Sequence, residues 1–311
     1  MYLGIDFLLR PPLDPVVIEV NVGLPGGAEE YDRAFRSLHG RAPGVFDRVE
    51  DIALREYGRP FREYLGGLPF LSALKGMKLW MDGKAPSPSA FHPALRLEDK
   101  WVQYQILKDL VPMPETMILG PENIAAAEAL LHARGRLACK LRSGRGGRGF
   151  LRIDSAEALR AAAVDGAPRI VQEWIDSRVD RFHFSIRAVA FGGRFLCAYA
   201  NLAQREYSNH SIIAVVEEGG RFGLEPERFL TRLFDAPSWE GVLWFGEDEP
   251  PYLYHNLRQD EAAEAALLLP ASVFSAIKAT AVRIERHYES LDWEKLPVAW
   301  FENGDFHTPE I

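Results

Sequence analysis

The sequence contains only two cysteines, no long apolar segment and no excess of positive charge. Cys139 and Cys197 lie in separate apolar segments, which favours two buried thiols in a reducing compartment over a disulfide or a metal pair. No segment approaches the roughly 18 consecutive apolar residues of a membrane-spanning helix. The net charge of −8 argues against nucleic acid or an anionic membrane as a partner. These absences argue against a membrane protein, a nucleic-acid-binding protein and a disulfide-stabilised protein.

The first residues also lack the features of a secretory leader. MYLGIDFLLRPP has neither a basic start nor a small-residue cleavage site, and Asp6 interrupts its short apolar run. We therefore expect a cytoplasmic protein. The 311 residues, 47% of them hydrophobic, suffice for roughly one to three globular domains.

Strand-like and helix-like segments alternate along the chain. The clearest strand patterns are Tyr2–Leu9, Val16–Val20, Phe182–Phe191 and Arg194–Asn201. Gly192–Gly193 separates the last two, which is a strong hairpin signal. Asp99 can cap a helix, and Ala271–Leu291 has a helical pattern. Mixed strands and helices with many hairpins favour an α+β fold over a doubly wound parallel sheet.

Two strand-like segments at the beginning of the chain carry oxygen-bearing side chains. Glu19 and Asn21 are two residues apart, so both face one side of a strand, and a hairpin would bring Asp6 alongside them. Such a group suits Mg²⁺, which leaves coordination positions open for phosphate oxygens. The alternative is that Glu19 and Asn21 form the solvent face of an amphipathic strand. A carboxylate within the apolar run VVIEVN is costly unless it has a partner.

A lysine and a glycine-rich segment follow each other in KLRSGRGGRGF, residues Lys140–Phe150. Glycines allow backbone N–H groups to approach an anion, and Lys140 would direct a positive charge at the same anion. The pattern differs from the phosphate-binding GxxxxGK[ST] motif because the lysine precedes the glycines. A mobile surface hairpin is the alternative interpretation.

Two further segments carry polar residues on strands. In IVQEWIDSRVD, an apolar strand ends in Glu173 and leads to an acidic residue seven positions later, Asp180. These residues could offer backbone and carboxylate acceptors to a base and a ribose, or the segment could simply be a strand with a polar end. In FHFSIRAV, Arg187 shares a face with His183 and Ser185. Arg187 is either a phosphate ligand or a surface arginine.

Together these segments resemble the ATP-grasp superfamily, which includes D-alanine–D-alanine ligase, glutathione synthetase and the ribosomal-protein glutamate ligases. The resemblance covers about residues 1–26 and 98–215. It rests on GID and EVN, on LEDK ending at Lys100 with VPMPET after it, on Lys140 with the glycine-rich segment, on QEWI and on the Phe184–Phe195 hairpin.

The resemblance implies a set of site residues. It implies that Mg²⁺, as two ions, is bound by Asp6, Glu19 and Asn21. The residues implied to bind ATP are Lys100, Lys140, Ser143, Gly144, Gly146, Gly147, Gln172, Glu173, Trp174, Ile175 and Asp180. Those implied to act in catalysis are Arg187, Arg205 and Asn209. Several ligases of the superfamily have an arginine two residues before the metal-binding aspartate. Gly4 takes that place here, so the phosphate contact falls to Arg187 or Arg205.

The order of the motifs differs from that in most ATP-grasp proteins, because the metal motif comes first. The same order occurs in relatives such as glutathionylspermidine synthetase, so the chain resembles a circular permutant. The resemblance implies a nucleotide held between two α+β subdomains. The implied organisation is metal-binding strands in 1–26, a mostly helical segment of unknown role in 27–97, a first subdomain with a glycine-rich lid loop in 98–168, and a second subdomain in 169–311 that packs on 1–26.

The implied activity is an ADP-forming ligation of a carboxylate to an amine through an acyl phosphate. The substrates would be ATP, a small-molecule or peptide carboxylate, and an amine, of which the last two are unidentified. A phosphotransferase on the same fold and a non-catalytic ATP-binding regulatory module are the alternatives. The oligomeric state is open, with a homodimer as one alternative.

Overall fold

The structure is a computed structural model that describes residues 1–22, 32, 44–66, 97, 99–143, 149–179, 182–203, 212–215, 223–224, 270–292 and 295–297. Its contacts divide the chain into two compact units. Unit 1 comprises Met1–Leu71 and Asp176–Leu291, and unit 2 comprises Ser72–Ile175 and Asp292–Ile311. The first strands of the chain therefore belong to the same unit as the hairpin around Gly192.

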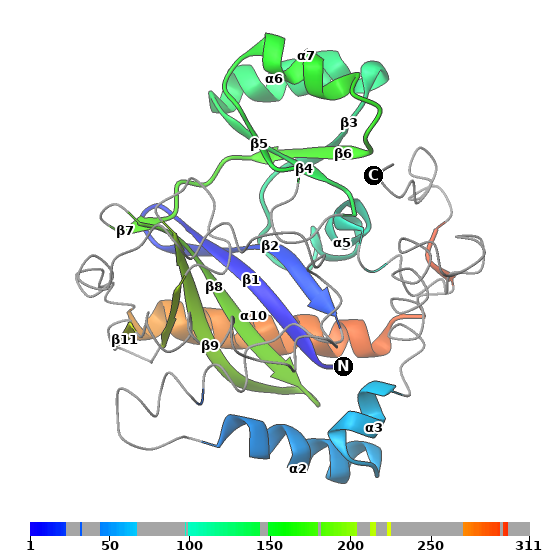
Figure 1. Ribbon diagram of the computed structural model, residues 1–311, viewed down its shortest axis with the longest axis vertical. Helices are drawn as coiled ribbons and strands as arrows, with labels where there is room; N and C mark the ends of the chain where they lie inside the picture. The colour runs from blue at the N-terminus through cyan, green and yellow to red at the C-terminus, as the bar shows by residue number, and fades with distance from the viewer. Residues whose placement is uncertain are drawn as a thin grey trace, which may run out of the picture. The chain divides into compact units, whose positions relative to one another are not determined.

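Unit 1 contains an antiparallel sheet with the strand order β11-β10-β9-β8-β1-β2, in which β7 also pairs with β8 (Figure 1). The strands are β1 (Leu3–Arg10), β2 (Asp14–Val22), β7 (Arg178–Val179), β8 (Phe182–Phe191), β9 (Arg194–Ala203), β10 (Ile212–Val215) and β11 (Gly223–Leu224). Gly192 and Gly193 form the predicted turn with positive φ angles of 57° and 70°. The two N-terminal strands thus share one antiparallel sheet with the hairpin of β8 and β9.

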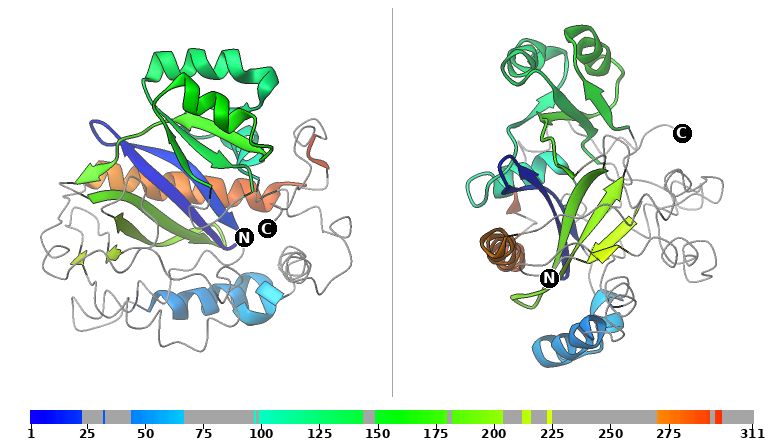
Figure 2. Two further views of the ribbon diagram at one scale, coloured as in Figure 1. Left: turned by 45° about the horizontal axis from the view of Figure 1, so that its top comes forward. Right: turned by 90° about the vertical axis from the view of Figure 1, so that its left-hand side faces the viewer.

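Helix α10 (Ala271–Ser290) covers one face of this sheet (Figure 2). Its fully buried side chains recur at helical spacing and are Ile277, Ala281, Ile284 and Tyr288. Phe274 packs edge-on against Phe195, with ring centroids 5.6 Å apart. Phe195 lies opposite Ala190, which lies opposite Leu3. The helix therefore covers the face that carries Leu3, Ile5 and Phe7, all fully buried.

Aromatic side chains fill the space between the other face and two helices, α2 (Val45–Tyr57) and α3 (Phe61–Gly66). The ring of Phe191 lies 5.7 Å from Tyr2, 5.2 Å from Tyr57 and 5.1 Å from Tyr64. Period-two geometry places Asp6 on the same face as Tyr2. The segment 27–97 was expected to be mostly helical with an unknown role, and its helices α2 and α3 pack against the sheet.

Unit 2 contains a second antiparallel sheet, with the strand order β3-β6-β4-β5. Its strands are β3 (Thr116–Leu119), β4 (Leu137–Leu141), β5 (Leu151–Ile153) and β6 (Arg169–Glu173). Its helices are α5 (Lys100–Leu107), the short 3₁₀ helix η3 (Pro121–Asn123), α6 (Ile124–Arg134) and α7 (Ala156–Ala163). Helices α6 and α7 lie together against this sheet, around a core that includes Leu130, Leu137, Leu159 and Val171 (Figure 1).

The sheet pairing defines where the two units divide. We expected a first subdomain to end at residue 168 and a second to begin at 169. Strand β6 pairs with β3 and β4, and the division falls after Ile175. None of the helices in the described ranges is long and apolar enough to cross a bilayer.

Ile5 tests whether β1 belongs to the core of unit 1. Ile5→Ala should lower the free energy of unfolding by about 2–5 kcal/mol, because it removes fully buried methyl groups and leaves a cavity. Leu54→Ala is the control, since Leu54 is 48% exposed, and its effect should be within about 0.5 kcal/mol. Urea denaturation followed by circular dichroism measures both. Equal small losses would contradict the placement of β1.

The thiols provide a second test. Burial raises the pKa of Cys139 to about 11, against the opposing effect of Arg169, and Cys197 is also buried. The thiolate is the reactive form. At pH 8 the native protein should therefore react slowly with iodoacetamide at both positions, and the urea-unfolded chain should react fast, as its thiols return to a pKa of about 8.5. Peptide mass spectrometry measures the labelling, and rapid native labelling of Cys139 would contradict the structure.

Candidate active site

Three charged residues form a row across adjacent strands of unit 1. Glu19 of β2 lies opposite Asp6 of β1, and Asp6 lies opposite Arg187 of β8. Tyr199 of β9 lies opposite Arg187 and extends the row. Side chains paired across antiparallel strands share a face, and here it is the face opposite α10. The row therefore joins residues that lie 181 positions apart in the chain.

Asp6 and Arg187 form a buried bidentate ion pair. Arg187 Nε donates to Asp6 Oδ1 and Arg187 Nη2 donates to Asp6 Oδ2, each at 2.7 Å. Burial alone would lower the pKa of Arg187, but Asp6 outweighs it, and the pKa is raised. The guanidinium therefore keeps its charge. Arg187 is only 7% exposed, so the interpretation as a surface arginine is wrong. Its charge is compensated by Asp6 within the sheet.

Asn21 completes the group of oxygen-bearing side chains. It lies opposite Gly4, two residues from Glu19, and its Nδ2 donates to Asp6 Oδ2 at 3.1 Å. The predicted hairpin thus brings Asp6, Glu19 and Asn21 together. Because each carboxylate oxygen has two lone pairs, Asp6 can accept from the arginine and still bind a cation.

This donor set fits Mg²⁺. Two carboxylates and an amide are hard oxygen ligands, and Mg²⁺ commonly takes one or two carboxylates and completes its shell with water and phosphate oxygens. Among the residues that the structure describes, no group of three or more His, Cys, Asp and Glu side chains could hold a metal. A cation at Asp6, Glu19 and Asn21 would therefore need further oxygens, which a bound nucleotide supplies.

The two candidate phosphate ligands of unit 2 lie on neighbouring stretches of backbone. Lys140 is on β4, two residues before Arg142, and the Lys100 backbone N–H donates to the Arg142 carbonyl at 2.9 Å. Ser143 follows at the surface. Lysine ammonium groups act as point charges that suit phosphates. The pair therefore fits the predicted anion site, while Gly144, Gly146 and Gly147 lie outside the described residues.

Gly149, after the glycine-rich segment, has a fixed conformation. Its φ of 65° is in the left-handed region, and a Cβ there would lie 2.8 Å from the Leu141 side chain. Arg169 Nη1 donates to the Gly149 carbonyl at 2.7 Å, and its Nε donates to Asp165 at 2.8 Å. The chain beyond the segment is thus anchored to the start of β6.

Gln172, expected to contact the adenine, makes a hydrogen bond to another side chain of unit 2. Its side chain is buried, and its Nε2 donates to Thr116 Oγ1 at 3.0 Å. Thr116 in turn donates to the Pro114 carbonyl at 2.9 Å. The Gln172 amide therefore links β6 to β3. No signal in the sequence distinguished this structural role from a role as a ligand of the adenine.

The residues after Gln172 retain features that suit a base. Strand β6 ends at Glu173, and the backbone of Trp174 and Ile175 lies beyond it. The Trp174 indole Nε1 is buried and has no hydrogen-bond partner among the residues that the structure describes. The guanidinium of Arg136 lies over the same ring, 5.4 Å from its centroid. An unsatisfied buried donor at this point fits a ligand with acceptor nitrogens.

Three other predicted residues lie outside the described residues. They are Asp180, expected to bind ATP, and Arg205 and Asn209, expected to act in catalysis. Their roles stay predictions.

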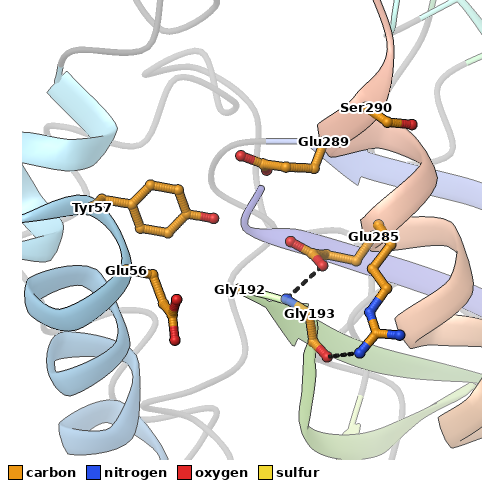
Figure 3. A pocket seen from close by; sticks show the side chains of 8 residues that line it. Glu56, Tyr57, Gly192, Gly193, Glu285, Glu289 and Ser290 are labelled. Atoms are coloured by element: carbon orange, nitrogen blue, oxygen red, sulfur yellow. Dashed lines mark hydrogen bonds between the residues drawn. The ribbon is translucent and has the colours of Figure 1, made fainter.

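An acidic cavity of unit 1 lies apart from the row, at the β8–β9 turn (Figure 3). Its volume is about 370 Å³, and carboxylates of Glu56, Glu285 and Glu289 line it with Tyr57. Glu285 accepts from the Gly193 N–H at 2.7 Å, and it pairs with the Met1 ammonium group, as does Glu289. These carboxylates therefore already have partners within the protein.

Sequence reasoning missed two buried residues near the candidate sites. Tyr199 is 2% exposed and stands beside Arg187. Arg142 is 1% exposed and pairs with Asp99. A signal for Arg142 was present in the sequence. It lies two residues after Lys140, so the alternation of side chains along a strand places it on the same face as that lysine.

The buried ion pair predicts a strongly non-additive stability effect. Arg187→Met should lower the free energy of unfolding by about 3–5 kcal/mol, because it leaves the Asp6 charge buried without a partner. Adding Asp6→Asn should recover most of that loss. Arg194→Met is the control, since its ion pair with Glu56 is exposed and is worth about 0–1 kcal/mol. Urea titrations measure all three, and additive losses in the double variant would contradict the pair.

Comparisons with known proteins give low similarities. Neither the family models nor the curated proteins include a match to this sequence. Among solved structures, D-alanyl-alanine synthetase A from Vibrio cholerae O1 biovar eltor str. N16961 is similar over 60% of this chain and 46% of its own, with a TM-score of 0.28 and 11% identity. The ATP-grasp ligase PsnB, complexed with a phosphomimetic variant of its minimal precursor, Mg and ADP, is similar over 57% of this chain and 62% of its own, with a TM-score of 0.27 and 15% identity. The chain thus matches less than two thirds of either protein, and the structural likeness to both ligases is low.

Proposed function

We propose that this chain is a Mg²⁺–ATP-dependent carboxylate–amine ligase that acts through an acyl phosphate. The row of Asp6, Glu19 and Arg187, with Asn21 beside it, supports this most directly. It combines hard oxygen donors with a permanent positive charge on one face of the sheet, where Asp6 and Arg187 are buried. The lysines of unit 2 carry positive charge that suits the phosphates of a nucleotide.

The roles of the residues follow from their chemistry. Asp6, Glu19 and Asn21 would hold Mg²⁺, which when bound neutralises charge on the phosphate oxygens. Arg187 holds Asp6 in place and adds a positive charge beside it. Lys100 and Lys140 bind phosphates as point charges. The backbone at the end of β6 and just beyond it, Glu173–Ile175, would contact the base.

The proposed reaction has two displacements. A substrate carboxylate oxygen attacks the γ-phosphorus, the bond to the bridging oxygen breaks, and ADP leaves. The amine nitrogen then attacks the acyl carbon, the bond to the phosphate oxygen breaks, and inorganic phosphate leaves as the nitrogen loses a proton. Positioning and charge neutralisation provide most of the rate enhancement in such phosphoryl transfers.

We also propose that the motif order is circularly permuted relative to most ATP-grasp ligases. The pairing of β1 with β8, whose partners Asp6 and Arg187 are 181 positions apart, supports this. A re-cut connection leaves packed strands unchanged, because only the loops differ.

An activity screen tests the proposal. The protein is incubated with Mg²⁺–ATP, pooled carboxylates and pooled amines, and ADP and ligated products are measured by mass spectrometry. Hydroxylamine should trap the acyl phosphate as a hydroxamate. A stable phosphorylated alcohol without ligated product would instead identify a phosphotransferase, and nucleotide binding without ADP release would identify a regulatory module. No nucleotide binding at all would contradict the proposal.

Glu19 gives a specific test of the metal site. Glu19→Gln should reduce Mg²⁺-dependent turnover about 100-fold or more, because it removes one ligand charge that helps to neutralise the phosphates. Asp14→Asn is the control, since Asp14 is an exposed carboxylate on the same strand. Turnover and Mg²⁺ titrations of nucleotide binding are measured for both. Equal behaviour of the two variants would exclude Glu19 from the site.

A further inference from the structure

A buried ion pair in unit 2 joins the residue before Lys100 to a residue just after Lys140. Arg142 Nε lies 2.9 Å from Asp99 Oδ2, and Arg142 Nη2 lies 2.7 Å from the same oxygen. The exposed fractions of the two side chains are 1% for Arg142 and 5% for Asp99. Both charges are therefore removed from water, and each depends on the other.

Backbone hydrogen bonds of Arg142 also join the end of β4 to the start of α5 and to the residue before β6. The Arg142 carbonyl accepts from Lys100 N–H, and the Arg142 N–H donates to the Pro168 carbonyl, each at 2.9 Å. This second bond continues the pairing of β4 with β6 past the end of the strand. Arg142 is thus fixed on one side to the sheet and on the other to the start of α5.

Asp99 has two functions at this point. Its Oδ1 accepts from the N–H groups of Trp101 at 2.8 Å and Val102 at 3.3 Å, which caps α5. The helix N-terminus is therefore satisfied by Asp99, and Lys100, 7% exposed, is the first residue of the helix. Because Asp99 precedes Lys100 directly, the orientation of the lysine depends on this carboxylate.

We propose that Asp99 and Arg142 are positioning residues that hold Lys100 and Lys140 at one phosphate site, an inference that rests on the proposed function. A buried ion pair adds little stability compared with an apolar pair of the same volume, because desolvation offsets the attraction. Its directional contacts do fix geometry, and a displacement of about 1 Å at a phosphate ligand can cost up to about 100-fold.

The test separates positioning from stability. Asn caps a helix as well as Asp does, so Asp99→Asn removes the charge and keeps the cap. Combining it with Arg142→Met removes both charges, and the melting temperature should return close to that of the wild type. Nucleotide binding, measured by calorimetry with Mg²⁺–ATP, should stay about 10- to 100-fold weaker. Wild-type affinity in a double variant of restored stability would overturn the inference.

Arg160→Met is the matched control. Arg160 pairs with Glu128 between α7 and α6 of the same unit, at 2.7 Å, and it is 63% exposed. This variant should bind ATP as the wild type does. An affinity loss equal to that of the double variant would show that any weakening of unit 2 impairs binding, and would overturn the specific role of Asp99 and Arg142.

A second measurement does not depend on full recovery of stability. In a chain carrying Lys100→Ala and Lys140→Ala, Asp99→Asn should weaken ATP binding no further, because the ligands it positions are gone. An additional loss of the same size as in the wild-type background would show a merely structural role. A wild-type protein that binds no ATP would instead overturn the proposed function itself, so the two failures are distinguishable.

Discussion

Asp6 and Arg187 are charged side chains buried on adjacent strands, and each compensates the charge of the other. Their bidentate contact fixes the register of β1 against β8. A shift by one residue would turn Asp6 to the apolar face under α10 and leave two charges unpaired. The positions of Glu19, Asn21 and Tyr199 follow from that register, because each is paired into the same sheet. One interaction thus aligns four strands around the candidate metal site.

The rest of unit 1 provides the surroundings in which that pair stays buried. On one face, Leu3, Ile5 and Phe7 are fully buried on the side that α10 covers. On the other face, the aromatic rings of Tyr2, Phe191 and α2–α3 pack around one end of the strands. Burial of this apolar surface offsets the desolvation of the charges. The polar row and the aromatic cluster share a face but occupy different stretches of the strands.

Unit 2 follows the same physical logic with different residues. Arg142 and Arg169 are buried or nearly so, and each donates to a carboxylate and anchors backbone near the glycine-rich segment. The planar guanidinium suits such bidentate contacts, whereas the lysine ammonium is a compact point charge that suits phosphate. Arginines thus maintain the framework in both units, and lysines are the candidate ligands. The sequence alone shows only basic residues near glycines, and that pattern does not separate arginines that hold the framework from lysines that bind a ligand.

Much of the local structure could be predicted from short-range sequence patterns. Alternating apolar residues predicted β1, β2, β8 and β9, Gly192–Gly193 predicted the turn between the last two, and Asp99 predicted the helix cap. All of these depend on residues a few positions apart. It also predicted that Asp6, Glu19 and Asn21 share a face, because period two and a hairpin are local geometry.

The pairing of side chains across long separations could not be predicted in this way, because it depends on how the strands and helices pack. Arg187 was equally consistent with a ligand and with a surface residue until β8 was placed beside β1. Gln172 matched an adenine motif, yet its amide is bonded to Thr116 on a strand more than 50 positions away. Arg142 gave no sign of its partner Asp99, which lies 43 positions earlier. The physical reason is that burial and the pairing of charges are set by how strands and helices pack, and the sequence pattern specifies a face but not its partner.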